Sequence, residues 1–114
     1  MSHKEFKIWE EYRNYPICGS VITNMYFLDD DTLVLYLDEP TPLDDDTLHS
    51  FSVEYQIDND KFVYTEDFYD GEEFIDFITL DKSPYDEEKQ KVIEGFLREV
   101  SEKWSEKWKN RNKC

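Results

Sequence analysis

The C-terminal third of the sequence carries an apolar stripe at the spacing of an α-helix, and such a stripe has to be buried against another part of the fold. Ser83, Pro84 and Asp86 supply an N-cap, a proline at the first helical position and an acid at the third, all of which favour helix initiation. Acidic residues lie early in the segment and basic residues late, which complements the helix dipole. We therefore predict a helix of about 25 residues that packs on a sheet. The stripe consists of Val92, Ile93, Phe96, Leu97, Val100, Trp104 and Trp108.

The middle of the chain has the composition of β-strands. Residues 20–28 and 33–38 are rich in β-branched and aromatic side chains, and the acidic turn 29–32 between them predicts a hairpin. Both segments are apolar on both faces over part of their length, so we expect them near the centre of the sheet. Residues 49–57 alternate apolar and polar side chains, which predicts a strand with one buried face, and residues 62–65 continue as its partner after a tight turn. The expected buried face comprises Phe51, Val53, Tyr55 and Ile57, and the expected exposed face comprises Ser52, Glu54 and Gln56.

Three further segments give weaker signals. Residues 4–15 place three aromatic rings at helical spacing, which predicts a short amphipathic helix that Pro16 ends. Residues 39–47 contain two prolines and an acidic triplet and predict a loop. Residues 71–80 fit either one helical face or a fifth strand, and we favour a short helix.

Together these segments predict one small α+β domain over residues 1–114. We expect mainly an antiparallel sheet of about four or five strands, with a short N-terminal helix and a long C-terminal amphipathic helix packed on it. Apolar residues make up 39% of the 114 residues and aromatic residues 17%, which is ample for one core. Residues 1–7 lack the hydrophobic stretch of a secretory signal, and no apolar run approaches the roughly 18 residues of a membrane span. We therefore expect a cytoplasmic protein.

Negative charge is concentrated in one part of the chain. The formal charge is -15, and residues 14–81 contain 18 carboxylates but a single cation, Lys61. Residues 1–13 are balanced, and residues 82–114 carry seven acidic and nine basic side chains. Because like charges on a compact body repel, a surface of one sign has to be offset by other interactions, which favours a functional role. The alternative is that the acids only keep the protein soluble.

A dense acidic surface favours partners that are built to hold nucleic acid. Seventeen charges equal those on about 29 Å of duplex DNA. We expect a non-catalytic inhibitor that mimics DNA or RNA towards a basic nuclease, restriction or CRISPR effector, or transcription factor, as in phage anti-defence proteins. Direct binding to nucleic acid or to an anionic membrane is disfavoured by the same charge. The expected partner-binding residues are Asp29, Asp30, Asp31, Asp38, Glu39, Asp44, Asp45, Asp46, Asp58, Asp60, Glu66, Asp67, Asp70, Glu72 and Glu73.

Two alternative functions remain open. An immunity protein or antitoxin that neutralises a cognate toxin would share the same electrostatics. A small acidic chaperone or assembly adaptor would instead use an apolar surface of the sheet or helix. A homodimer through Trp104 and Trp108 is a further possibility.

The sequence offers no specific signal for catalysis, for a metal or for another cofactor, and we expect none of these. The acidic clusters lack the ligand spacing of a calcium loop, and the cysteines are too isolated for structural zinc. Cys18 and His49 are the available nucleophile and base pair, and chance supplies such a pair in most chains. Five tyrosines of the acidic region either fill the core or pack against arginine side chains of a partner. They are Tyr26, Tyr36, Tyr55, Tyr64 and Tyr69.

Overall fold

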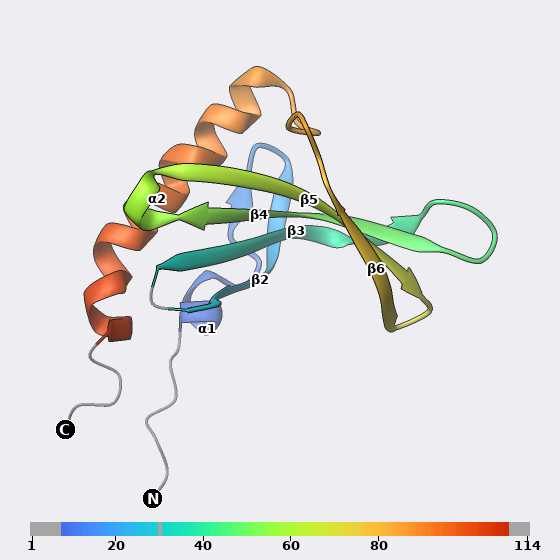
Figure 1. Ribbon diagram of the computed structural model, residues 1–114, viewed down its shortest axis with the longest axis horizontal. Helices are drawn as coiled ribbons and strands as arrows, with labels where there is room; N and C mark the ends of the chain where they lie inside the picture. The colour runs from blue at the N-terminus through green and yellow to red at the C-terminus, as the bar shows by residue number, and fades with distance from the viewer. Residues whose placement is uncertain (1–7, 30, 110–114) are drawn as a thin grey trace, which may run out of the picture.

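Six antiparallel strands follow one another in chain order across one sheet, and a C-terminal helix covers part of one face (Figure 1). The computed structural model describes residues 8–29 and 31–109. The protein is therefore a small α+β domain, as the sequence predicts, although the strand number is six and not four or five. The elements are α1 (Ile8–Tyr12), β1 (Pro16–Ile17), β2 (Ser20–Phe27), β3 (Thr32–Pro42), β4 (Leu48–Gln56), the 3-10 turn η1 (Ile57–Asn59), β5 (Lys61–Asp70), β6 (Glu73–Thr79) and α2 (Glu87–Lys109).

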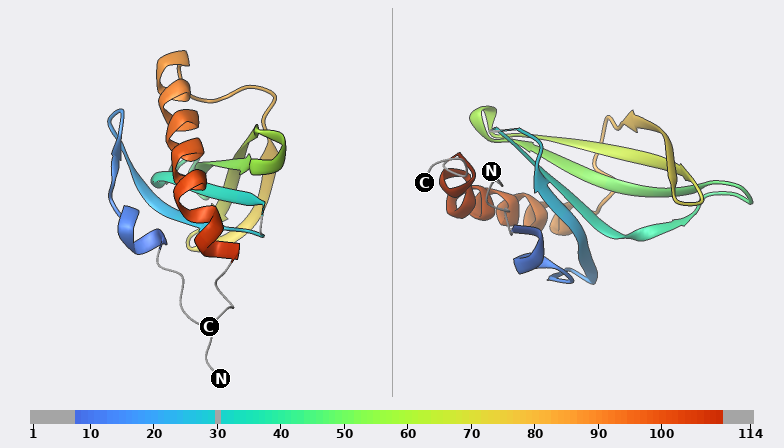
Figure 2. Two further views of the ribbon diagram at one scale, coloured as in Figure 1. Left: turned by 90° about the vertical axis from the view of Figure 1, so that its left-hand side faces the viewer. Right: turned by 90° about the horizontal axis from the view of Figure 1, so that it is seen from below.

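The sheet curves around α2, so that β1 and β2 lie on one side of the helix and β5 on the other (Figure 2). The hairpin of β3 and β4 and the hairpin of β5 and β6 both extend beyond the helix, which makes the molecule elongated, with extents of 49 × 35 × 24 Å. One end of the sheet is therefore covered by α2 and the other end is not. We call the side of the sheet that faces away from α2 the outer face.

The core lies between α2 and the sheet. Ile93, Leu97, Val100 and Trp104 are buried on the helix, which confirms the central part of the predicted stripe, whereas Val92 is 44% exposed. The side chain of Trp108 lies outside the described residues. Because Trp104 packs into the core, with its indole N–H donating to the Tyr12 hydroxyl, it is not available for the dimer seam suggested by the sequence. The sheet side of the core is formed by Ile17, Ile22, Met25, Phe27, Leu33, Leu35, Leu37, Val53, Tyr55 and Tyr64.

The prediction of a helix over residues 71–80 is wrong, because this segment forms the edge strand β6. Gly71 adopts a φ of 63° in the turn after β5, which reverses the chain so that β6 pairs antiparallel with β5. The local pattern suited both structures, and pairing with β5 decided between them. The N-terminal helix ends earlier than predicted, at Tyr12 and not at residue 15, and residues 4–7 of the expected helix lie outside the described residues.

Two boundaries differ from those expected. Strand β3 continues to Pro42, where a loop was predicted, and Pro42 lies opposite Leu48 of β4. Prolines are tolerated there because β2 pairs with β3 only as far as Leu37, so this part of β3 is an edge. The helix α2 starts at Glu87, and Asp86, not Ser83, caps it by accepting the Lys89 N–H at 2.8 Å.

The outer face of β4 is also more buried than its alternating pattern predicts. Ser50 is 6% exposed and Ser52 3% exposed, and Glu54 and Gln56 are half-buried. Tyr69 of the neighbouring strand β5 contacts Ser50, whose hydroxyl donates to the Tyr69 hydroxyl at 3.3 Å. The outer face therefore has an organised polar layer of its own.

Candidate protein-binding face

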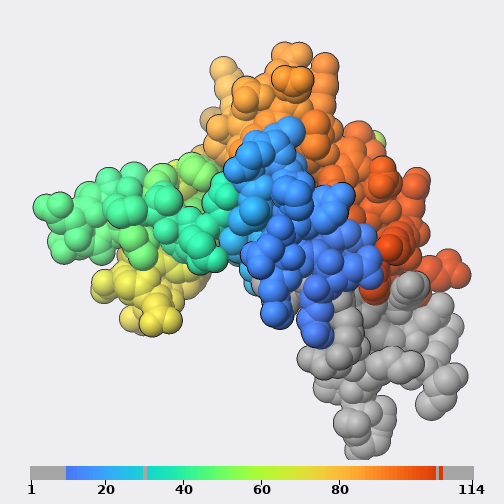
Figure 3. Space-filling view, turned by 180° about the vertical axis from the view of Figure 1, so that it is seen from behind, coloured from blue at the N-terminus to red at the C-terminus, as the bar shows by residue number. Residues whose placement is uncertain are grey.

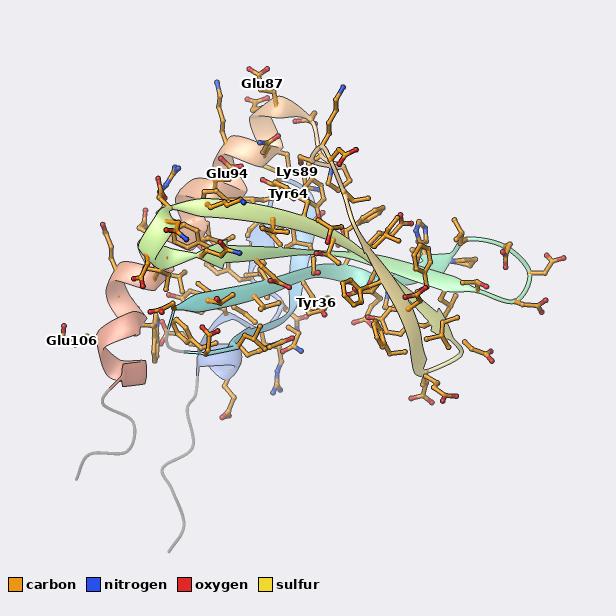
Figure 4. The ribbon with its side chains drawn as sticks, viewed as in Figure 1. Tyr36, Tyr64, Glu87, Lys89, Glu94 and Glu106 are labelled. Carbon is orange, nitrogen blue, oxygen red and sulfur yellow. The ribbon has the colours of Figure 1, made fainter. Side chains whose placement is uncertain are left out.

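A chain of hydrogen-bonded side chains crosses the outer face from β2 to β5. The rings of Tyr26 and Tyr36 stack at 6.4 Å, and the Tyr36 hydroxyl bonds to the Asp67 carboxylate. Ser52 and Thr65 lie in register with Tyr36 on β4 and β5. Because both are small, Tyr36 can lie along the sheet and reach Asp67 two strands away. Figure 4 shows Tyr36 near the middle of the sheet.

Asp67 is a buried carboxylate whose hydrogen bonding does not fully offset the cost of its burial. It is 4% exposed, and among the described residues its Oδ2 atom has no hydrogen-bond partner. Burial raises the pKa of Asp67, and the bond from Tyr36 partly opposes this effect. Burial, followed by repulsion from Asp67 and Asp29, also raises the pKa of Glu54 on the same face. A buried carboxylate with one unpartnered oxygen destabilises the fold, and such sites commonly have a functional role.

A pocket of about 300 Å³ opens on this face beside the tyrosines. It carries three aromatic rings and two carboxylates, and its lining contains neither lysine nor arginine. The combination of rings and negative charge suits a cationic group. The residues that matter for this chemistry are Tyr26, Tyr36, Tyr69, Asp38, Glu39 and Ser50.

An aromatic platform adjoins the pocket. Tyr69 contacts the ring of Phe74 at 6.0 Å, and Phe74 stacks with Phe77 at 6.3 Å. Phe74 and Phe77 are 52% and 55% exposed, and Ile75 and Ile78 of the same strand are 53% and 46% exposed. Exposed apolar groups of this size gathered on one strand are typical of an interaction site. Sequence reasoning missed Phe74 and Phe77 because it favoured a helix for this segment.

The backbone edge of β6 is protected, so the strand presents its side chains more than its edge. The register of β6 shifts opposite Phe68 and Tyr69, and the Phe77 N–H is bonded to the carboxylate of Asp76 at 2.8 Å. Irregular pairing and edge carboxylates are devices that oppose the addition of a further strand.

The acidic residues divide between the two ends of the sheet. The uncovered end, residues 38–50 and 66–77, contains eleven carboxylates and no lysine or arginine, and we call it the distal arm. Figure 3 shows its two hairpin ends as neighbouring projections. Nine of these carboxylates are exposed, which leaves only Glu66 and Asp67 outside the set. The exposed ones are Asp38, Glu39, Asp44, Asp45, Asp46, Asp70, Glu72, Glu73 and Asp76.

The other predicted site residues lie apart from this group. Asp29 and Asp31 are in the turn between β2 and β3. A hydrogen bond from the Ile57 N–H to the Asp31 carbonyl joins this turn to η1, which contains Asp58 and is followed by Asp60. Asp60 is bound to Arg98 at 2.9 Å, and that guanidinium and the Tyr55 hydroxyl lower its pKa. The fifteen predicted residues therefore do not share one face, and Asp30 lies outside the described residues.

Two distal acids are engaged within the protein. Glu66 contacts the His49 ring at 2.7 Å, where both side chains are largely buried, and Asp67 is bonded to Tyr36.

Two of the five tyrosines belong to the other side of the sheet. Tyr64 donates to Glu94 of α2 at 2.6 Å (Figure 4). Tyr55 donates to Asp60 at 2.8 Å.

A larger hollow of about 1300 Å³ lies between β5, α2 and the segment that connects β6 to α2. Its lining includes Lys61 and Lys82 together with Asp60, Asp81 and Glu94. Because both signs of charge are present, this hollow lacks the selectivity for cations that the outer-face pocket has. Binding chemistry is therefore most developed on the outer face.

The nucleophile and base pair noted in the sequence is not brought together. Cys18 lies in the exposed turn between β1 and β2, whereas His49 is on β4 and bonded to Glu66. Among the described residues no three His, Cys, Asp or Glu side chains come together in a way that could hold a metal ion. In the same part of the chain, no helix combines the length and apolar character needed to cross a membrane. Comparison with known proteins finds no matching family model, no similar curated protein and no similar solved structure.

Proposed function

We propose that this chain is a non-catalytic binding protein that antagonises a basic, nucleic-acid-binding partner. The distal arm carries the proposal, because it presents nine exposed carboxylates and no lysine or arginine. The arm enters the nucleic-acid-binding surface of the partner, and the rings of the outer face pack against the side chains around it.

The amount of charge on the arm supports this proposal. Nine charges correspond to about 15 Å of duplex DNA. They lie on two hairpins, at residues 38–46 and 70–76. A surface that holds a phosphate backbone therefore meets carboxylates from two adjoining parts of the arm. Exposed rings next to the acids add the aromatic anchors that protein interfaces favour.

The proposal is tested by affinity capture from the source cells at low salt, followed by elution with a salt gradient. We expect a basic, nucleic-acid-binding protein that leaves the column as salt rises, because exposed charges are screened. Its binding should compete with DNA or RNA. Capture of no such protein, or a complex that tolerates bound nucleic acid, would contradict the proposal.

A matched pair of variants locates the surface. The first variant combines Asp44→Asn, Asp45→Asn and Asp46→Asn and removes three charges from the distal arm. The second combines Glu99→Gln, Glu102→Gln and Glu106→Gln and removes three exposed charges from α2. Exposed ion pairs contribute about 0.2–1 kcal/mol each, so the first variant should weaken partner binding about 3- to 100-fold. The second variant should bind as the wild type does. Equal loss in both variants would show that only net charge matters.

The apolar exposure of β6 favours a second function, a small chaperone or assembly adaptor. In that case Phe74, Ile75, Phe77 and Ile78 would contribute most of the affinity. Binding would then lose little affinity between low and high salt, whereas charge mimicry requires a steep loss. An immunity protein or antitoxin would behave like the charge mimic, and identification of the captured partner as a toxin would establish that version.

A further inference from the structure

We propose that the outer-face pocket receives an arginine side chain of the basic partner. This inference rests on the proposed function, since it names the group that the partner inserts and the place where it is held.

The pocket has the chemistry that a guanidinium group requires. Tyr26 and Tyr36 present stacked rings, with Tyr26 36% exposed, and a guanidinium plane stacks on such rings. Asp38 and Glu39 add two exposed carboxylates to the lining. A volume of about 300 Å³ is at the small end of ligand pockets, which suits one inserted side chain.

Asp67 is a buried carboxylate that adjoins the residues of the pocket. Its side chain is 96% buried, it is bonded to the Tyr36 hydroxyl of the pocket wall, and its register partner Ser50 also lines the pocket. Its Oδ2 atom has no partner among the described residues. Asp67 is not itself part of the lining, so a cation in the pocket acts on this carboxylate at longer range and through Tyr36. The bond from Tyr36 also leaves the hydroxyl oxygen able to accept a hydrogen bond from the guanidinium.

The surroundings of the pocket indicate that the cation belongs to a protein. Tyr69 lines the pocket and also contacts Phe74, so the pocket continues into the aromatic platform of β6. A free small cation would leave that platform exposed, whereas a protein surface around the arginine would cover it. A contact between the distal arms of two copies of this chain is disfavoured, because arms with eleven carboxylates each and no lysine or arginine repel.

The first test uses small probes with the wild-type protein and needs no partner. N-acetyl-arginine amide, the lysine equivalent and the neutral citrulline equivalent are titrated while backbone amide signals are followed by NMR. We expect saturable shifts at residues around Tyr26, Tyr36 and Tyr69 with the arginine probe, about tenfold weaker binding of the lysine probe, and no saturation with citrulline. Absence of saturation with arginine, or equal binding of citrulline, would overturn the inference.

The second test compares pairs of variants with the identified partner. Tyr36→Phe and Asp67→Asn should each weaken partner binding about tenfold. Tyr64→Phe and Glu102→Gln are the matched controls, since Tyr64 also donates to a carboxylate but on the α2 side, and Glu102 is an exposed acid of α2. An amide spectrum like that of the wild type establishes that each variant is folded.

The outcomes separate the inference from the proposed function. A basic partner that is captured but binds the pocket variants and the control variants equally would refute the arginine pocket and leave the acidic antagonist standing. Failure to capture any basic partner would refute the proposed function, while the probe titration would still report on the pocket directly.

Discussion

Replacement of Asp67 by Asn should make the protein more stable at neutral and alkaline pH. Asp67 is 4% exposed, and among the described residues its Oδ2 atom has no hydrogen-bond partner. An asparagine keeps an oxygen that can accept the Tyr36 hydroxyl and has nearly the same shape. It removes the buried charge, which is the unfavourable part of the present arrangement.

The sign of the pH dependence follows from the direction of the pKa change. Burial raises the pKa of Asp67 above the ordinary value of about 3.9, and the Tyr36 hydrogen bond opposes this only in part. The folded protein therefore binds this proton more tightly than the unfolded chain does. The free energy of unfolding falls as the pH rises from the unfolded pKa through the folded pKa, and the loss is complete above it. Glu54, whose pKa is also raised by burial, contributes in the same direction.

The expected magnitude comes from the cost of an unsatisfied buried polar group, which is about 1–3 kcal/mol. Because the asparagine amide keeps part of this cost, we expect the free energy of unfolding of Asp67→Asn to exceed that of the wild type by about 1–2 kcal/mol near neutral pH. That difference corresponds to a melting temperature higher by about 4–10 °C for a domain of this size. It should shrink as the pH falls through the folded pKa of Asp67 and be smallest below the unfolded value of about 3.9, where the wild-type carboxyl is protonated.

The assay is urea unfolding at a series of pH values, with Asp70→Asn as the control. Asp70 ends the same strand but is exposed, so its replacement should change the free energy of unfolding by less than about 0.5 kcal/mol at every pH. A destabilised Asp67→Asn variant, or a gain that is the same at acid and neutral pH, would refute the view of Asp67 as an uncompensated buried charge. A variant that is more stable but binds the partner more weakly would show that stability is sacrificed at this site for binding.

Four further predictions concern the fold. Leu97→Ala should lower the free energy of unfolding by about 2–5 kcal/mol in urea melts, because Leu97 is fully buried between α2 and the sheet, and a loss below about 1 kcal/mol would contradict this packing. Asp86→Ala should cost about 0.5–2 kcal/mol, whereas Ser83→Ala should cost much less, and the reverse order would place the cap at Ser83. Phe77→Ser should change the melting temperature by only about 1–2 °C but weaken partner binding, since Phe77 is 55% exposed. A large drop in stability would mean that Phe77 is part of the core. Stability should rise as ionic strength is raised to about 0.15 M, because the carboxylates of the distal arm repel one another, and a melting temperature that ignores salt would argue against a clustered acidic arm.

The candidate site was only partly accessible from the sequence. Charge counting identified the acidic region and its tyrosines, because composition is independent of structure. It could not tell that Asp60 is paired with Arg98, that Glu66 contacts His49 or that Asp67 is buried, because each of these depends on which strand lies beside which. The exposure of the Phe74 and Phe77 rings could not be predicted for the same reason.

The sequence by itself determined the elements whose local pattern fits only one type of secondary structure. The stripe from Ile93 to Trp104 can be buried only by a helix, and the alternation from Phe51 to Tyr55 suits only a strand, so the α+β class followed from periodicity. Tertiary structure decided residues 73–79, where apolar residues suit either period and pairing with β5 selects the strand. It also decided the second face of the sheet, because only the register of β3, β4 and β5 brings Tyr36 to Asp67 and leaves one carboxylate oxygen without a partner.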